Sequence, residues 1–279
     1  MPDQFLRYPI RGQKFSYSIE TRRHLLSRKT DFQQIDVYDT EAFGKVLTLD
    51  GHVQLSSLDE HAYHESLVHI PLMSLSTRKR ALVVGGGDRG VLREICRWPD
   101  VEQVDMIEID RGVIESCRET LPELSAGAFD DPRVHVRIAD AFKFLKESRE
   151  PYDFIVMDIT DAYEEEDGEL SEQLFTESFH RDIANCLAPG GFLVTQADNH
   201  IFCTYSMENL KTTLQKVFRN VGSYQAIVPS FGGFSGFVWA GNSAQVPTAH
   251  PAWPSFSLRY LNPTTYALAF ENLGFALRG

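Results

Sequence analysis

The stretch LVVGGGDRG at residues 82–90 decides the fold. Its apolar beginning predicts a buried strand, and the glycines predict a turn into a helix that starts near Val91. The turn matches the pattern GxGxxG, in which glycines let a ligand approach the backbone and the N-terminus of the following helix. Because this short pattern is common, the residues at the ends of the next strands must decide what the turn binds.

Two acids stand at those strand ends. Glu108 ends the next strand, where a carboxylate can accept hydrogen bonds from both hydroxyls of a ribose. Asp140 ends the third strand and is placed to meet an adenine amino group. Each acid also has a plainer role as a helix cap or a strand end, as does Asp88 in the turn. As an ordered set at one edge of the sheet, they predict a nucleoside cleft.

Strands and helices alternate around this stretch. Strands are expected at 80–84, 104–109, 134–138, 154–159 and 192–195, with helices at 91–98, 112–121, 173–187 and 206–218. This alternation predicts an α/β fold whose mostly parallel sheet has helices on both faces. The late strands at 224–228 and 236–240 predict an antiparallel addition to that sheet.

The N-terminal part has a different pattern. Residues 15–57 form short alternating runs, and Asp50-Gly51 between two of them predicts a tight hairpin. Residues 58–75 have a helical pattern, and the strand–helix alternation of the rest of the chain begins near residue 76. We therefore expect a β-rich domain at 1–76 and a catalytic domain at 77–279.

Composition excludes several classes of protein. The 279 residues are 43% hydrophobic and 24% charged, which is typical of globular chains. The net charge of −12 argues against nucleic-acid binding and is compatible with a cationic ligand. Four scattered cysteines without a metal-ligand spacing indicate reduced thiols in the cytoplasm. No signal peptide or membrane span is expected, because no apolar run approaches about 20 residues.

The charge in the turn narrows the choice of nucleoside. Asp88 would place a negative charge beside the pyrophosphate of a dinucleotide, which Arg89 would only partly offset. A cationic sulfonium nucleoside suits an acidic cleft better. S-adenosylmethionine and its decarboxylated form are both such nucleosides.

Together these residues resemble the spermidine synthase family, the polyamine aminopropyltransferases. The resemblance is carried by AFGKV (42–46), LDGHVQ (49–54), DEHAYHE (59–65), the GGGD turn (85–88), IEID (107–110), DPRV (131–134) and YLNP (260–263). It implies a Rossmann-like methyltransferase-type domain behind a small N-terminal β-hairpin domain, usually in a homodimer. It also implies decarboxylated S-adenosylmethionine as donor, a diamine or polyamine as acceptor, methylthioadenosine as by-product, and neither a metal nor a prosthetic group.

The resemblance also assigns roles to individual residues. The nucleoside would be bound by Gln33, Glu108, Asp140 and the adjacent Ala141. His64 and Asp88 would face the aminopropyl arm and the acceptor, and Tyr63 and Asp161 would line the polyamine channel. Asp158 would be the catalytic base. The chemistry agrees, because only a neutral amine can attack the carbon beside sulfur and a carboxylate can take its proton. Like charges on Asp88 and Asp161 should raise the pKa of Asp158, while Asp161 holds a distal ammonium.

Four departures from the family pattern leave alternatives open. Three are single replacements: Arg89 and Ala141 each replace a glycine, and Phe231 replaces a tyrosine. The fourth is the segment from Asp158 to Ala162, which lacks two prolines and precedes an acidic stretch at 164–167. We expect Arg89 to pair with the acidic stretch over the cleft, although it can also be an exposed residue in the first helical turn. Two further hypotheses remain. One is a methyl or aminocarboxypropyl transferase in which Arg89 binds the carboxylate of S-adenosylmethionine. The other is a non-catalytic polyamine or nucleoside sensor.

Overall fold

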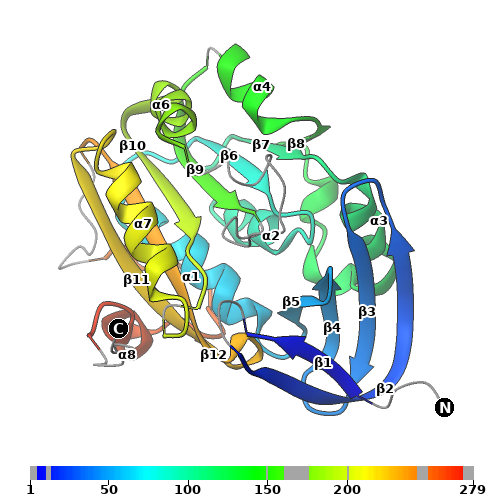
Figure 1. The fold of residues 1–279 in the computed structure, drawn as a ribbon. Helices are drawn as coiled ribbons and strands as arrows, with labels where there is room; N and C mark the ends of the chain where they lie inside the picture. The colour runs from blue at the N-terminus through cyan, green and yellow to red at the C-terminus, as the bar shows by residue number, and fades with distance from the viewer. Residues whose placement is uncertain are drawn as a thin grey trace.

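The structure is a computed structural model that describes residues 5–10, 14–148, 150–159, 176–199, 201–243 and 251–272. It contains two sheets (Figure 1). The first sheet is N-terminal, antiparallel and five-stranded. Its strands follow chain order and are β1 (Phe5–Pro9), β2 (Ser16–Lys29), β3 (Gln34–Thr40), β4 (Gly44–Leu49) and β5 (His52–Ser56).

The hairpin between β4 and β5 confirms the prediction made from Asp50-Gly51. Both residues have positive φ, 48° at Asp50 and 80° at Gly51, as a two-residue turn between right-twisted strands requires. One face of the sheet is buried against α3 (Arg111–Thr120), where Ile35 and Leu47 join Val113 in a core cluster. The N-terminal sheet thus packs beside the second one.

The second sheet has seven strands in the order β11-β12-β10-β9-β6-β7-β8. They are β6 (Arg80–Gly85), β7 (Gln103–Glu108), β8 (Val134–Ile138), β9 (Tyr152–Asp158), β10 (Leu187–Gln196), β11 (Asn220–Val228) and β12 (Gly233–Gly241). Strands β10, β9, β6, β7 and β8 are parallel, whereas β12 runs antiparallel to both β10 and β11. This confirms the predicted fold class and the antiparallel addition.

Helices cover both faces of this sheet. They are α1 (Glu60–Leu72), α2 (Gly90–Cys96), α3, α4 (Ala141–Glu147), α6 (Glu177–Asn185), α7 (Thr204–Leu214) and α8 (Pro263–Ala269), with short 3-10 turns η1 (Pro122–Leu124), η2 (Ala128–Asp130) and η3 (Pro229–Phe231). Alternate residues of β6 serve two cores: Ala81 and Val83 pack with residues of α1 and α2, and Leu82 and Val84 with residues of α4, α6 and α7. The expected helix at 173–187 begins at Glu177 within the described residues, and α4 and α8 had not been predicted.

Chain connectivity places the site. The chain leaves β6 toward β7 on one side, while β9 pairs with the other side of β6. The carboxyl ends of β6 and β9 therefore form a topological switch point, where open α/β sheets bind ligands. Helix α1 follows β5 directly and packs on α2 and β11. A domain boundary near residue 76 stays a prediction.

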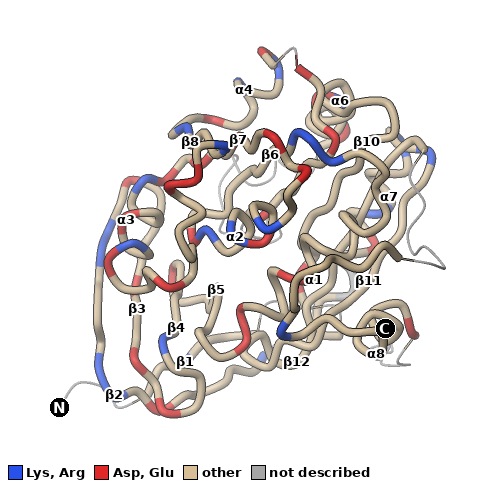
Figure 2. The backbone as a smooth tube through the Cα atoms, turned by 180° about the vertical axis from the view of Figure 1, so that it is seen from behind, with Lys and Arg blue, Asp and Glu red and all other residues tan. Residues whose placement is uncertain are grey.

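Membrane spans, cysteines and the distribution of charge were also considered in the sequence. No helix in the described part of the chain is long and apolar enough to cross a membrane. The four cysteines are present as thiols, as expected from their spacing. Acidic and basic residues are scattered along the backbone between longer stretches of other residues (Figure 2).

Candidate active site

Glycines allow α1 and β9 to approach the turn between β6 and α2. The Gly86 N–H donates a 2.8 Å hydrogen bond to the carbonyl oxygen of Asp158. A Cβ at Gly85, whose φ is 79°, would lie 2.2 Å from that same oxygen. At Gly90, a Cβ would lie 2.1 Å from the ring of His64. These positions need glycine because the switch point is packed against backbone and an aromatic ring.

Asp158 ends β9 and has the properties of a base. Its Oδ1 accepts a 2.7 Å hydrogen bond from the hydroxyl of Tyr63 on α1. Burial and, after it, the charge of Asp88 together raise the pKa of Asp158 to about 6. The predicted direction is therefore right, although burial contributes more than the like charge. A carboxylate with this pKa accepts protons better than an ordinary aspartate does.

Asp88 bonds to the start of α2 and also lies in the site. Its Oδ1 accepts a 2.7 Å hydrogen bond from the N–H of Gly90, the first residue of α2, although Arg89 and not Asp88 is at the N-cap position. The same oxygen lies 3.4 Å from Nε2 of His64. Ligand atoms of His64, Asp88 and Asp158 all lie within 4.8 Å of one another. Although burial opposes its ionisation, His64 keeps the pKa of Asp88 below its usual value.

His64 is a buried side chain between two carboxylates. Only 1% of its side chain is exposed, and its Nδ1 lies 2.7 Å from Oε2 of Glu60. Burial favours the neutral ring, but Asp88 and Glu60 raise the pKa of His64 to about 10. A doubly protonated imidazole has no lone pair for a metal ion. The two aspartates beside it are therefore better suited to an alkylammonium group than to a metal.

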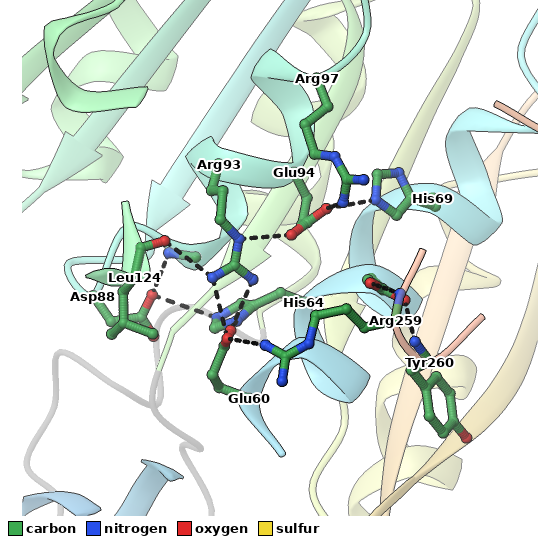
Figure 3. A network of polar contacts seen from close by, with 12 residues as sticks. Glu60, His64, His69, Asp88, Arg93, Glu94, Arg97, Leu124, Arg259 and Tyr260 are labelled. Atoms are coloured by element: carbon green, nitrogen blue, oxygen red, sulfur yellow. Dashed lines mark hydrogen bonds and ion pairs between the residues drawn. The ribbon is translucent and has the colours of Figure 1, made fainter. Parts of the chain in front are cut away.

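A network of ion pairs extends from His64 into the protein (Figure 3). Arg93 on α2 donates to both oxygens of Glu60, at 3.1 Å and 2.8 Å. Arg93 also donates to Glu94, which bonds to His69 at 2.8 Å and to Arg97 at 2.7 Å. The sequence analysis gave Glu60 no role. The spacing of Glu60 and His64, four residues apart on a helix, was the available signal.

Two other acids near α1 hold further parts of the site. Asp59 accepts hydrogen bonds from the N–H and hydroxyl of Ser230 in η3, at 2.7 Å and 2.8 Å. Glu65 accepts three backbone N–H groups at 2.7 to 2.9 Å, those of residues 259, 260 and 261. Phe231 follows Ser230, and its ring lies edge-on to Tyr63 with centroids 5.7 Å apart. The family tyrosine position thus borders Tyr63.

The expected nucleoside residues lie on the other side of the turn. Glu108 is buried at the end of β7, and its Oε1 accepts the Asp110 N–H at 2.8 Å. Burial raises the pKa of Glu108 to about 7. Gln33 donates to Asp110 at 2.8 Å, which brings it to the end of the same strand. Asp140 is half-buried and caps α4 by accepting the Phe142 N–H, and Ala141 is the first residue of that helix.

The position of Arg89 in the structure differs from the one predicted. It is not an exposed residue of the first helical turn, since only 3% of it is exposed. Its φ of 77° lies in the left-handed region, which glycine adopts more readily than arginine does. The guanidinium donates to the Ile114 carbonyl at 3.2 Å and lies 4.5 Å from the centre of the Phe129 ring. Asp161 and the acidic stretch at 164–167 lie outside the described residues, so their expected places at the cleft are not described.

Two family models match the chain. The spermine/spermidine synthase domain matches residues 60–249, and the spermidine synthase tetramerisation domain matches residues 5–57. A polyamine aminopropyltransferase of Pectobacterium carotovorum is 38% identical over 271 residues, which cover 96% of this chain and 86% of the relative. One from Sodalis glossinidius is 41% identical over 257 residues, covering 91% of this chain and 84% of the relative.

Solved structures are similar over nearly the whole chain. A spermidine synthase in complex with the transition state analogue AdoDATO has a TM-score of 0.88 and 25% sequence identity, covering 99% of this chain and 94% of its own. The spermidine synthase of Thermotoga maritima has a TM-score of 0.85 and 24% identity, covering 99% and 93%. The second likeness concerns the fold alone.

Proposed function

The chain belongs to the spermine/spermidine synthase family and is a polyamine aminopropyltransferase, and we propose that its donor is decarboxylated S-adenosylmethionine and its acceptor putrescine or a related polyamine. The donor proposal is supported by the related spermidine synthase that was solved with the transition state analogue AdoDATO. With putrescine, the products would be spermidine and methylthioadenosine.

The proposed reaction is a direct displacement. The neutral amine of the acceptor attacks the aminopropyl carbon next to the sulfonium, so an N–C bond forms while the C–S bond breaks. The electron pair of the broken bond stays on sulfur, which leaves as the neutral thioether of methylthioadenosine. Asp158 takes the proton that the amine loses. Neutralising an alkylammonium at pH 7 costs about 4 kcal/mol, so this proton transfer matters for the rate.

The remaining residues divide between the two substrates. Asp88 faces the aminopropyl arm and the acceptor, and Tyr63 orients Asp158 through its 2.7 Å hydrogen bond. Gln33, Glu108, Asp140 and Ala141 would hold the nucleoside of the donor. Asp161 would bind the distal ammonium of the acceptor, a role that the resemblance alone supports.

One observation carries the proposal. Tyr63, His64, Asp88 and Asp158 come from three separate segments and meet at the switch point, with Asp158 a half-buried carboxylate of raised pKa. A polyamine or nucleoside sensor needs no such base. A reaction that uses S-adenosylmethionine itself needs a cation for its carboxylate, and the guanidinium of Arg89 is instead bonded to Ile114.

Product analysis tests the proposal. The protein is incubated with decarboxylated S-adenosylmethionine or S-adenosylmethionine, each with putrescine and with longer polyamines. We expect methylthioadenosine and an aminopropylated amine from the decarboxylated donor only. Release of S-adenosylhomocysteine would support the methyltransferase hypothesis, and tight binding of a polyamine without any product would support the sensor.

We also propose that the protein is a cytoplasmic homo-oligomer that assembles through residues 5–57. That segment matches a model described as a tetramerisation domain, and Phe5, Phe15 and Tyr17 on it are exposed. The homodimer expected from the sequence and a tetramer are both compatible with this surface. Light scattering coupled to gel filtration separates them, and a monomer at micromolar concentration would contradict the proposal.

A further inference from the structure

The geometry points to Glu60 as a positioning residue that holds His64 as an imidazolium, whose charge lets Asp88 and Asp158 be ionised together. Only 4% of the Glu60 side chain is exposed, and its oxygens contact His64 and Arg93. Glu60 acts through His64 on the two aspartates, and this inference rests on the proposed function of Asp158 as the base.

Both nitrogens of the His64 ring face a carboxylate. Nδ1 lies 2.7 Å from Glu60, and Nε2 lies 3.4 Å from Asp88. Only the doubly protonated ring can present an N–H to both at once. The ring is also held in place, because it packs against Gly90, where even a Cβ would come within 2.1 Å, and edge-on to Tyr63 at 5.3 Å.

The groups closest to His64 come from three segments. Glu60 and His64 are on α1, Asp88 is in the turn before α2, and Asp158 ends β9. Behind Glu60, Arg93 on α2 donates to both of its oxygens, and Arg259 reaches within 4.0 Å of one of them. Although burial opposes its ionisation, His64 and then Arg93 lower the pKa of Glu60 to about 2.

The charge of His64 affects the ionisation of Asp158, the proposed base. Two carboxylates within 4.8 Å of each other resist being ionised together, because each raises the pKa of the other. A cation next to both offsets that repulsion. Without the charge of Glu60, His64 loses its second proton at lower pH, and the aspartate pair retains a proton at neutral pH. Asp158 would then be unable to accept a proton from the acceptor until the pH is higher.

Glu60→Gln tests the inference with Glu94→Gln as its matched control. The glutamine oxygen can still accept the His64 Nδ1–H, so the ring keeps its place while the charge is removed. Glu94 is also a buried acid that pairs with Arg93, but it bonds to His69 rather than to His64. Both variants remove one buried acid from the same network.

We expect Glu60→Gln to move the acid limb of kcat to higher pH by about one unit, the effect of one neighbouring charge. Activity would fall about tenfold below that limb and return toward the wild-type rate near pH 9. Glu94→Gln should lower thermal stability without moving the limb. An unmoved limb in Glu60→Gln, or an equal shift in both variants, would overturn the inference.

The protonation of His64 can be measured without any turnover. In ¹⁵N-histidine-labelled protein, with the His64 signals assigned by their loss in His64→Asn, both ring nitrogens should be protonated at pH 8. In Glu60→Gln, one nitrogen should be unprotonated at that pH. A neutral ring at pH 7 in the wild type would overturn the inference even if Glu60→Gln failed to fold. Absence of aminopropyl transfer would refute the proposed function instead, and the titration would still decide the state of His64.

Discussion

The two sides of the switch point are built differently. On the reaction side, Tyr63, His64, Asp88 and Asp158 are joined by contacts between segments that are distant in the sequence. On the nucleoside side, Glu108 and Asp140 bond to backbone N–H groups two residues further on. The reaction side depends on long-range polar contacts, whereas the two acids of the nucleoside side depend on local turns at strand ends and only Gln33 reaches that side from a distant segment.

This difference separates two kinds of effect. Changes on the reaction side should alter kcat and its pH dependence, because they disturb the charges around Asp158. Changes on the nucleoside side should alter donor affinity, because the strand ends persist when one side chain is replaced. The following substitutions test whether the two sides can be separated in this way.

Asp158→Asn should have the largest effect. The amide has a similar volume but cannot accept a proton, so the rate should fall about 10²–10⁴-fold with donor binding largely preserved. Single-turnover rates and calorimetric titration with the donor measure the two quantities. Near-normal kcat at neutral pH would show that another group is the base.

Gly90→Ala should move His64 with no change in charge. The added Cβ would lie 2.1 to 2.4 Å from three atoms of the His64 ring, so ring or turn must shift. A misplacement of about 1 Å can cost about 10²-fold in rate, and we expect a loss of that order in kcat. Donor affinity should change much less. A variant whose donor affinity falls as much as kcat would contradict the separation of the two sides.

Glu108→Gln should weaken donor binding and leave kcat nearly unchanged. Hydrogen bonds to a charged group contribute about 1.5–3 kcal/mol, so the donor Kd should rise about 10- to 150-fold. The pKa of about 7 adds a pH test. Because the ionised carboxylate accepts both ribose hydroxyls, wild-type donor binding should tighten as the pH rises through 7, and the variant should show no such change.

Phe231→Tyr should give a smaller gain on the acceptor side. The ring already lies against Tyr63, at 5.7 Å between centroids, so a hydroxyl would extend toward the reaction side. One added hydrogen bond is equivalent to about 0.5–1.5 kcal/mol in acceptor affinity. A diamine Kd that does not tighten would mean that the hydroxyl points away from the acceptor.

Arg89→Gly should have the smallest effect on activity. The sequence suggested that Arg89 pairs with the acidic stretch at 164–167 over the cleft, in which case its loss would raise the acceptor KM, but the guanidinium is bonded to Ile114 and packed on Phe129. A positive φ costs a non-glycine residue about 1–3 kcal/mol, and glycine removes this strain. Glycine also loses the hydrogen bond and the ring contact of the guanidinium, which are of similar strength. We expect thermal stability to change by a few degrees and KM to change less than twofold. A large, salt-dependent rise in acceptor KM would restore the original hypothesis.

The sequence predicted the parts of the molecule that local patterns determine. The hairpin at Asp50-Gly51, the strand–turn–helix at residues 82–90 and the acids at strand ends all depend on nearby residues. The burial of Arg89 was not predictable, because it depends on Phe129 and α3, which pack against the turn only in the folded chain. The roles of Glu60 and Asp59 were missed for the same reason, since Arg93 and Ser230 meet them only through tertiary packing.

The pH dependence of kcat tests most directly whether Asp158 is the catalytic base. The rate of methylthioadenosine release is measured from pH 5 to 9 with both substrates saturating. Because a raised pKa means that the proton is bound at higher pH, the rate should fall as the pH drops through about 6, the pKa of Asp158. A rate that stays constant from pH 5 to 8 would contradict this account.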